Sequence, residues 1–271
     1  MCLSKFFRLS IVIFVLLLMP VNVILGDGIT AITKPSADVT LSFVQAGRIA
    51  LINFREGDSV KVGDVLVQQD DAVERARLAQ LEAESNDKTK IQASEFTLAQ
   101  RRVDLERLEA RPKAVTQTEL EHAKLNLDIA ELSLRVAVFQ HEQAQRKYEE
   151  AKLQIERMSL KSPIDGRIEE IEIEAGESVN ALDDVVRVVR VNPLWIDVPV
   201  PLSQTTNLGY GHTAVVEFPS PKKVSVEGTV IFIAAVADAG SDTLRVRIQV
   251  PNNSSRPAGE HVVVTFPTLQ K

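Results

Sequence analysis

The sequence has little of what most catalytic and metal sites are built from. In 271 residues there are one cysteine (Cys2), four histidines, one tryptophan and two tyrosines. A lone cysteine makes neither an internal disulfide nor a cysteine-ligated metal site, so packing has to supply the stability. The formal net charge of −6 at pH 7 provides no basic field, which argues against nucleic acid as a partner.

Catalytic and cofactor motifs are missing as well. The histidines are scattered, with no pair at metal-ligand spacing: His122, His141, His212 and His261. No glycine-rich phosphate loop follows a strand pattern, and no Gly-x-Ser-x-Gly or His-Glu-x-x-His string occurs. We therefore predict a protein that is not an enzyme, with no catalytic residues, no cofactor and no metal.

The N-terminus has the order of a secretory signal. Lys5 and Arg8 precede an apolar run from Ile11 to Leu18, and a small residue, Gly26, precedes the expected cleavage point. We predict a signal peptide over residues 1–26. An uncleaved anchor remains open, because residues 9–25 are mostly apolar and 17 residues is the lower limit for spanning a bilayer.

Glycine is missing between Asp70 and Met158, and Pro112 is the one proline there. Helix formers dominate, so we predict an antiparallel coiled-coil hairpin over residues 72–158, with its tip near residues 110–118. The second helix opens with Thr116 or Thr118 as the cap. Its seam has two heptad positions, one with Leu120, Leu127, Leu134, His141, Tyr148 and Ile155, the other with Ala123, Ala130, Ala137, Ala144, Ala151 and Met158.

The first helix, from Ala72 to about Glu109, has a less regular seam. Leu78 and Leu81 fit one register, whereas later seam residues fit another, which predicts a change of phase within residues 82–90. Helices of about 40 residues extend roughly 60 Å at 1.5 Å per residue. We interpret His141 as a histidine of the seam, either satisfied there or sensitive to pH.

A second apolar stripe lies on the second helix, in the half nearer the tip. Two interpretations stay open: the stripe widens the seam within the hairpin, or it contacts neighbouring protomers or a partner. Its members are Leu125, Ile129, Leu132, Val136 and Phe139.

A short segment occurs twice, on either side of the hairpin, at an offset of 119 residues. Each repeat reads as strand, glycine turn and strand, and a unit this small cannot bury its apolar face alone. We therefore expect the two repeats to pair, which makes one β-domain split by the hairpin. Gly47, Arg48, Ile49, Ile52, Gly57, Ser59, Val60 and Asp64 return as Gly166, Arg167, Ile168, Ile171, Gly176, Ser178, Val179 and Asp183.

The C-terminal part alternates apolar and polar residues in short runs separated by proline and glycine. This pattern predicts a small antiparallel β-barrel. The runs are residues 195–200, 214–218, 224–233, 244–250 and 261–266.

Three segments together resemble the membrane fusion proteins, the periplasmic adaptor subunits of bacterial efflux and secretion systems (HlyD-like). GRIALINFREGDSVKVGDVLVQQDD resembles the first lipoyl half-motif, and LKSPIDGRIEEIEIEAGESV is similar to the second. GTVIFIAAVADAGSDTLRVRIQVPN resembles the barrel that follows. The resemblance implies a mixed α and β fold, with a split lipoyl-like (barrel-sandwich hybrid) β-domain, the hairpin and the barrel.

The resemblance also divides the chain into 27–71 (N-terminal segment and first lipoyl half), 72–158 (hairpin), 159–191 (second lipoyl half) and 192–271 (barrel). A carrier role is disfavoured, because residues 68–71 hold no lysine where lipoyl carriers are modified. By this resemblance we expect a short form of the family, without the membrane-proximal domain of many members, because the sequence stops at Lys271 soon after the expected barrel. In family members that dock a channel, the hairpin tip has Arg, then Leu four residues later, then Ser seven residues after that. With Thr116 at the Ser position, Leu105 and Glu109 stand at the Arg and Leu positions, so only the hydroxyl of Thr116 matches this pattern.

The expected function is thus a non-catalytic adaptor in the periplasm of a Gram-negative-type bacterium, at the inner membrane. It would link an inner-membrane transporter to an outer-membrane channel or another outer partner, as a trimer or hexamer by family analogy. A stand-alone periplasmic scaffold or regulatory module is the alternative. Candidate contact residues are Arg111, Lys113, Val115, Thr116, Thr118, Leu132, Val136 and Phe139.

Overall fold

The computed structural model describes residues 28–111, 114–219 and 222–267, in two compact units. The barrel unit comprises Met1–Lys34 and Leu194–Lys271, and the hairpin unit comprises Pro35–Pro193. The signal peptide or anchor predicted over residues 1–26 lies outside the described residues.

The barrel unit is built on an antiparallel sheet with the order β1-β12-β9-β10-β11-β8, and β1 pairs additionally with β8. Alternate residues of β8, such as Ile196 and Val198, are completely buried, as the alternating sequence pattern predicts. A short helix, α4 (Leu202–Thr205), follows β8. The strands are β1 (Ile29–Ser42), β8 (Asp184–Pro201), β9 (Thr213–Phe218), β10 (Val224–Ile233), β11 (Thr243–Val250) and β12 (His261–Thr265).

One strand of the barrel comes from a region to which the sequence assigned no element. Ile29 to Ile32 of β1 pair with β12, in register from Ile29–Val264 to Ile32–His261. The alternation of apolar and polar residues in this strand is interrupted by Lys34 and Pro35, which hides the strand from pattern reading.

The split β-domain of the hairpin unit is made by the two repeats. The first repeat gives β2 (Gly47–Ile52), β3 (Ser59–Val60) and β4 (Val65–Gln69); the second follows β5 (Ser159–Lys161) and gives β6 (Gly166–Ile171), β7 (Ser178–Val179) and the start of β8. Each repeat lends its short strand to the other, because β2 pairs with β7 and β6 pairs with β3. The predicted pairing of the repeats is confirmed.

The core of this domain draws equivalent residues from both repeats. Ile49 and Ile168 are each 1 % exposed, and Val60 and Val179 are buried beside them. Leu66, Val67, Val185 and Val186 belong to the same cluster. Neither repeat could bury these side chains without the other, so the domain closes only after the chain has returned from the hairpin.

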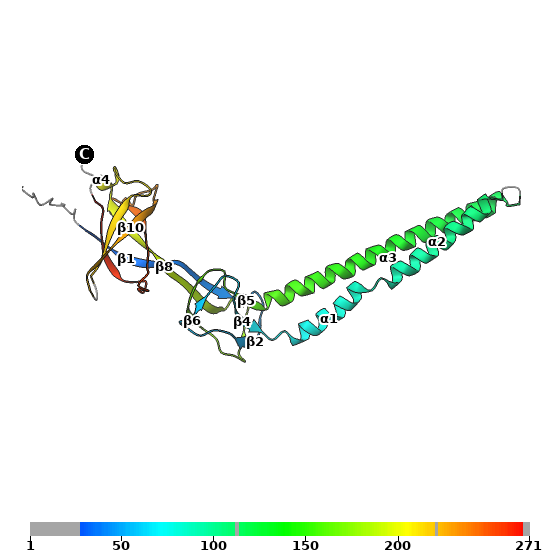
Figure 1. Cartoon of the computed structure of the whole chain (residues 1–271), viewed down its shortest axis with the longest axis horizontal. Coiled ribbons are helices and arrows are strands. Elements are labelled where there is room, and N and C mark those ends of the chain that lie inside the picture. Colours follow the sequence, from blue (N-terminus) through cyan, green and yellow to red (C-terminus); the bar gives the residue numbers. More distant parts are fainter. Residues whose placement is uncertain (1–27, 112–113, 220–221, 268–271) are drawn as a thin grey trace, which may run out of the picture. The chain divides into compact units, whose positions relative to one another are not determined.

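The hairpin consists of α1 (Ala72–Asn86), α2 (Thr89–Glu109) and α3 (Gln117–Arg157), with α1 and α2 running along α3 (Figure 1). The prediction of one continuous first helix was wrong, because it breaks at Asp87 and Lys88. The break falls within the stretch where a phase change was expected. Ser85, Asn86 and Asp87 favour it, since short polar side chains offer the backbone alternative hydrogen bonds: Asp87 Oδ1 accepts from the Thr89 amide at 2.8 Å.

Candidate interaction surfaces

The root of the hairpin is the point where a lipoyl carrier would present its lysine. Gln69 stands there with 2 % exposure, and its Nε2 donates to the Gln45 carbonyl at 3.1 Å. A Cβ on Gly47 would lie only 2.8 Å from the Gln69 amide, so the absence of a side chain at residue 47 makes room for it. The position is therefore a packed junction between sheet and helix.

Two acids complete this root. Asp71 is 8 % exposed and accepts from Arg75 Nε at 2.7 Å and from Gln68 Nε2 at 3.0 Å. The hydrogen bond from Arg75 keeps the pKa of Asp71 below its usual range, although burial of the carboxylate opposes this. Asp70 pairs with Arg48 of β2. These contacts fix the start of α1 on the β-domain.

The tip of the hairpin is ordered by a capping box at the start of α3. Thr116 Oγ1 accepts from the Glu119 amide at 3.3 Å, and the Glu119 carboxylate accepts from the Thr116 amide at 2.8 Å. Thr116 is therefore the cap, and Thr118 lies inside the helix with an exposed side chain. Arg111 is exposed and Val115 half-buried; the candidate Lys113 lies outside the described residues.

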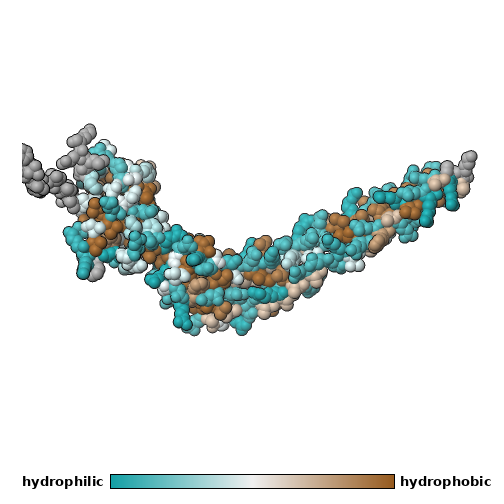
Figure 2. Space-filling view, in the orientation of Figure 1, coloured by the Kyte–Doolittle hydropathy of each residue, from teal (hydrophilic) through white to brown (hydrophobic). Residues whose placement is uncertain are grey.

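Burial along α3 follows the predicted seam. Ala130 and Ala137 are buried, and the other seam residues between Leu120 and Ile155 are half-buried. The second stripe is different, because its side chains from Leu125 to Phe139 are each 53–55 % exposed. The candidates Leu132, Val136 and Phe139 thus share one solvent-facing surface, separate from the tip. Figure 2 shows apolar patches alternating with hydrophilic surface along the hairpin.

His141 is half-buried within the seam. Its Nε2 lies 3.3 Å from Gln145 Nε2, and its Nδ1 has no hydrogen-bond partner among the described residues. Asp87, at the break, has a lowered pKa, chiefly from its hydrogen bonds with Thr89 and with a smaller contribution from His141. Lys90, just after the break, donates to Gln140, the neighbour of His141 in the chain, at 3.5 Å, so the break and the histidine lie near each other.

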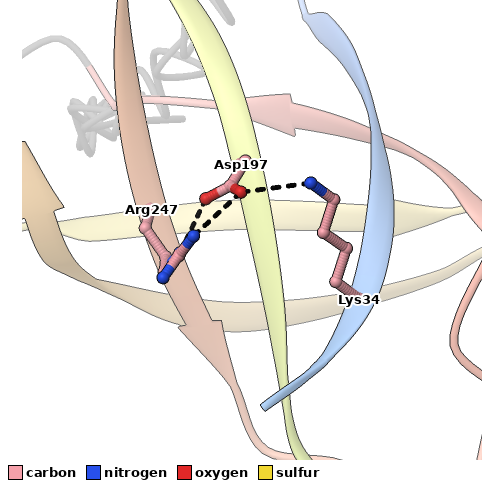
Figure 3. Close-up of polar contacts among 3 residues, drawn as sticks. All are labelled: Lys34, Asp197 and Arg247. Atoms are coloured by element: carbon pink, nitrogen blue, oxygen red, sulfur yellow. Dashed lines mark hydrogen bonds and ion pairs between the residues drawn. The ribbon is translucent and has the colours of Figure 1, made fainter. Parts of the chain in front are cut away.

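An ion-pair network that sequence reasoning missed lies on the barrel (Figure 3). Arg247 of β11 donates to both oxygens of Asp197 on β8, at 2.7 and 3.0 Å, and Lys34 of β1 approaches the same carboxylate at 3.3 Å. The guanidinium also stacks on Trp195, 4.6 Å from the ring centre. The Arg247 hydrogen bonds hold the pKa of Asp197 below its usual range, although burial opposes them. Only the register of three strands brings these residues together.

The described residues contain no group of three or more His, Cys, Asp or Glu side chains arranged to hold a metal ion. Within the same ranges, no helix combines the length and the apolar character needed to cross a membrane.

A β-domain divided by a long helical hairpin and followed in the chain by a small barrel defines the structural class of this protein. The chain belongs to the RND membrane fusion protein family: the family profile "RND MFP, barrel-sandwich hybrid domain" matches residues 37–190. The profile "CusB-like, beta-barrel domain" matches residues 193–262. The fold class predicted from the sequence is confirmed at this level: a barrel-sandwich hybrid domain with a helical hairpin, and a β-barrel.

Individual proteins agree with this family. The multidrug export protein EmrA of Haemophilus influenzae is 28 % identical over 66 % of this chain and 55 % of its own length. The multidrug resistance protein MdtA of Escherichia fergusonii is 27 % identical over 83 % of the chain and 53 % of its length. The chain thus spans about half the length of these relatives. The crystal structure of MacA from Actinobacillus actinomycetemcomitans shares the fold, with a TM-score of 0.68, 17 % identity, and coverage of 88 % of this chain and 78 % of MacA.

Proposed function

We propose that this protein is a non-catalytic periplasmic adaptor that links an inner-membrane transporter to an outer-membrane channel or another outer partner during export. The observation that carries the proposal is the split β-domain, which closes only when a helical arm of 41 residues in α3 has returned to it. Such an arm places a contact surface about 60 Å from the domain that holds it. Relatives named for multidrug export support the same role.

The roles of the parts follow from this proposal. The limbs of the hairpin would form an antiparallel coiled coil, and the tip with Arg111, Lys113, Val115, Thr116 and Thr118 would meet the outer partner. Leu132, Val136 and Phe139 would meet a neighbouring protomer in a ring of three or six. The adaptor would work in the periplasm at the inner membrane, whether its N-terminal apolar run is cleaved or retained. The relatives do not favour the alternative of a stand-alone scaffold.

Photo-cross-linking in native membranes tests this role. A photoreactive residue at Thr118, exposed near the tip, should capture an outer-membrane protein, and one at Thr229, exposed on the barrel strand β10, should capture an inner-membrane transporter. Glu149, exposed on α3 far from the tip, is the matched control and should capture neither in quantity. Capture of only soluble proteins at both test sites would refute the adaptor role.

A further inference from the structure

The seam of the first limb is one residue short at the break between α1 and α2 (Figure 1). On either side of the break, its buried and half-buried residues keep the spacing of three and four. They are Leu78, Leu81 and Ser85 before the break, and Ile91, Ser94 and Leu98 after it. Ile91 follows Ser85 by six positions, whereas equivalent heptad positions are seven apart. A continuous helix would turn Ile91 about 100° away from the seam, so the chain leaves the helix at Asp87, whose ψ of 113° is extended.

The second limb continues without interruption opposite this break, and His141 occupies its seam there. Just beyond the break, Lys90 Nζ donates to Gln140 at 3.5 Å. Toward the root, Glu84 and Lys147 line the same groove between α1 and α3. His141 lies between these two levels, so the first limb offers it the interrupted segment in place of an apolar seam side chain.

The hydrogen bonding of the His141 ring is incomplete. Its buried Nδ1 has no partner in the part of the chain that the structure describes, and its Nε2 lies 3.3 Å from Gln145 Nε2. When the Gln145 amide donates to Nε2, the proton of a neutral ring is on Nδ1, where no acceptor meets it. A protonated ring has an N–H donor at both nitrogens and a positive charge, which an anion could satisfy.

On its own helix, His141 has no charged neighbour at contact spacing. Side chains three and four residues apart meet on a helix surface. At those positions stand Ala137, Val138, Ala144 and Gln145. Glu142, the next residue, is exposed and forms an ion pair with Arg146 at 3.2 Å. An ionic partner for His141 therefore has to come from the first limb.

The first limb presents the carboxylate of Asp87 at this level. Asp87 Oδ1 accepts from the Thr89 amide at 2.8 Å and so caps the start of α2. The pKa of Asp87 is lowered mainly by its hydrogen bonds with Thr89, and further by Lys90 and His141, so both basic side chains lie within electrostatic reach of this carboxylate. The other charged side chains of this stretch are all exposed: Glu82, Glu84, Lys88 and Lys90.

We propose that His141 and Asp87 form a proton-operated clasp across the break in the hairpin. When the ring is protonated, its Nδ1–H donates to the Asp87 carboxylate and joins the start of α2 to α3. When the ring is neutral, this attraction is absent and the junction of α1 and α2 opens more often. A histidine gains its proton near pH 6.5, so the clasp is closed below about that pH and is lost as pH rises. The clasp depends on the hairpin alone and holds whether or not the protein is an adaptor.

Amide hydrogen exchange in the full chain, followed by mass spectrometry, tests the clasp. Protection factors, which remove the intrinsic effect of pH on exchange, are compared at about pH 5.5 and about pH 7.5. Protection over residues 82–92 should be about tenfold higher at the lower pH, while that over residues 98–107 of α2 changes less than about twofold. Equal protection of residues 82–92 at both pH values, or higher protection at the higher pH, would overturn the proposal. This comparison needs no variant, so it stands even if a variant fails to fold.

Two variants separate the clasp from packing. His141→Gln keeps a hydrogen-bonding side chain in the seam but takes up no proton, so the difference between the two pH values should vanish. Asp87→Asn keeps a good cap for α2 but removes the charge, with the same expected result. The matched control is His122→Gln, which changes a histidine of α3 in the groove near the tip and should keep the full difference. A difference that survives His141→Gln or Asp87→Asn, or one that His122→Gln abolishes, would overturn the clasp.

Lys90 provides a test of the electrostatics. Its cation is attracted to the same carboxylate and repels a charged imidazole, so it opposes closure of the clasp. Lys90→Gln should therefore move the midpoint of the protection change to higher pH. A midpoint that stays in place or moves to lower pH would contradict the pairing of His141 with Asp87.

Discussion

The two repeats of the split β-domain have the same turns but different ends. The amides of Gly57 and Gly176, at φ of +88° and +91°, both donate at 2.8 Å to a carbonyl of the opposite repeat, that of Ile168 or Ile49. Asp64 and Asp183 accept from the amides of equivalent turn residues, Lys61 and Asn180, at 2.8 and 2.9 Å. Local spacing is therefore enough to build the same backbone twice.

The repeats diverge after their last strand. In the first, β4 ends at Gln69, and the acids Asp70 and Asp71 lead into α1; in the second, Val188 and Val189 continue as β8. Acids near a helix start are favoured by the helix dipole, whereas consecutive buried valines favour a strand. A few residues after a shared motif thus decide whether the chain leaves the domain or stays in the sheet.

The largest difference between the repeats should appear at their first glycines. A Cβ on Gly166 would lie 2.5 Å from the Val189 carbonyl oxygen, whereas a Cβ on Gly47 would meet the Gln69 side chain at 2.8 Å. A backbone atom in a sheet moves aside less easily than a side chain does. Gly166→Ala should therefore cost about 3 kcal/mol of unfolding free energy and Gly47→Ala about 1 kcal/mol. Urea unfolding followed by circular dichroism measures both. Equal losses would mean that Gln69 is as rigid as the sheet.

The next difference concerns the carboxylates beside each repeat. Asp71→Asn removes a carboxylate that is 11 % exposed from its bond with Arg75, and should cost about 2 kcal/mol at pH 7. Asp38→Asn breaks the pair with Arg187 on β8, where both side chains are about 40 % exposed, and should cost less than about 1 kcal/mol.

The pH dependence of the Asp71 effect has a defined sign. The pKa of Asp71 is lowered in the folded chain, so its contribution is complete above the unfolded pKa of about 3.9 and is lost as pH falls through the folded value. The stability gap between wild type and Asp71→Asn should therefore close below about pH 4. A gap that stays constant down to pH 2 would contradict this origin.

The smallest effect lies at the second turn. Leu182 has a φ of +67° and is 73 % exposed, where the first repeat has Gly63 at +90°. A left-handed conformation costs a residue with a Cβ about 1–2 kcal/mol. Glycine avoids this cost but loses about 0.5–1 kcal/mol of stability, because its unfolded chain has more conformational entropy. Leu182→Gly should thus raise the stability by about 0.5 kcal/mol.

Gly63→Leu, the converse change, should lower the melting temperature. In the double variant, the strained leucine then lies in the turn of the first repeat and the glycine in the turn of the second. If Leu182→Gly instead lowers the stability, the exposed leucine makes a contact that outweighs its strain, as in an assembled ring.

Much of this fold could be predicted because its determinants are local. The alternation of a large residue with Ala from Leu120 to Ala151 sets the seam of α3, and Thr116 with Glu119 sets its start. The repeats predicted their own pairing. The break at Asp87 was located only as a change of phase, since a shifted register can be met by a kink or by an interruption.

The rest depends on contacts between distant segments. Lys34, Asp197 and Arg247 meet only because three strands align. The register of these strands cannot be predicted from the sequence of any one strand alone. The stripe from Leu125 to Phe139 was visible in the sequence, but its position on the back of the hairpin depends on where α2 packs.

The heptad seam also allows the length of the hairpin to change in steps of seven residues per limb. Removing seven residues from α2 and seven from the level stretch of α3 would restore every seam contact, shorten the arm by about 10 Å and leave the β-domain untouched. In the proposed adaptor role, the length of the arm could therefore change in fixed steps of one heptad while the β-domain and the tip keep their structures.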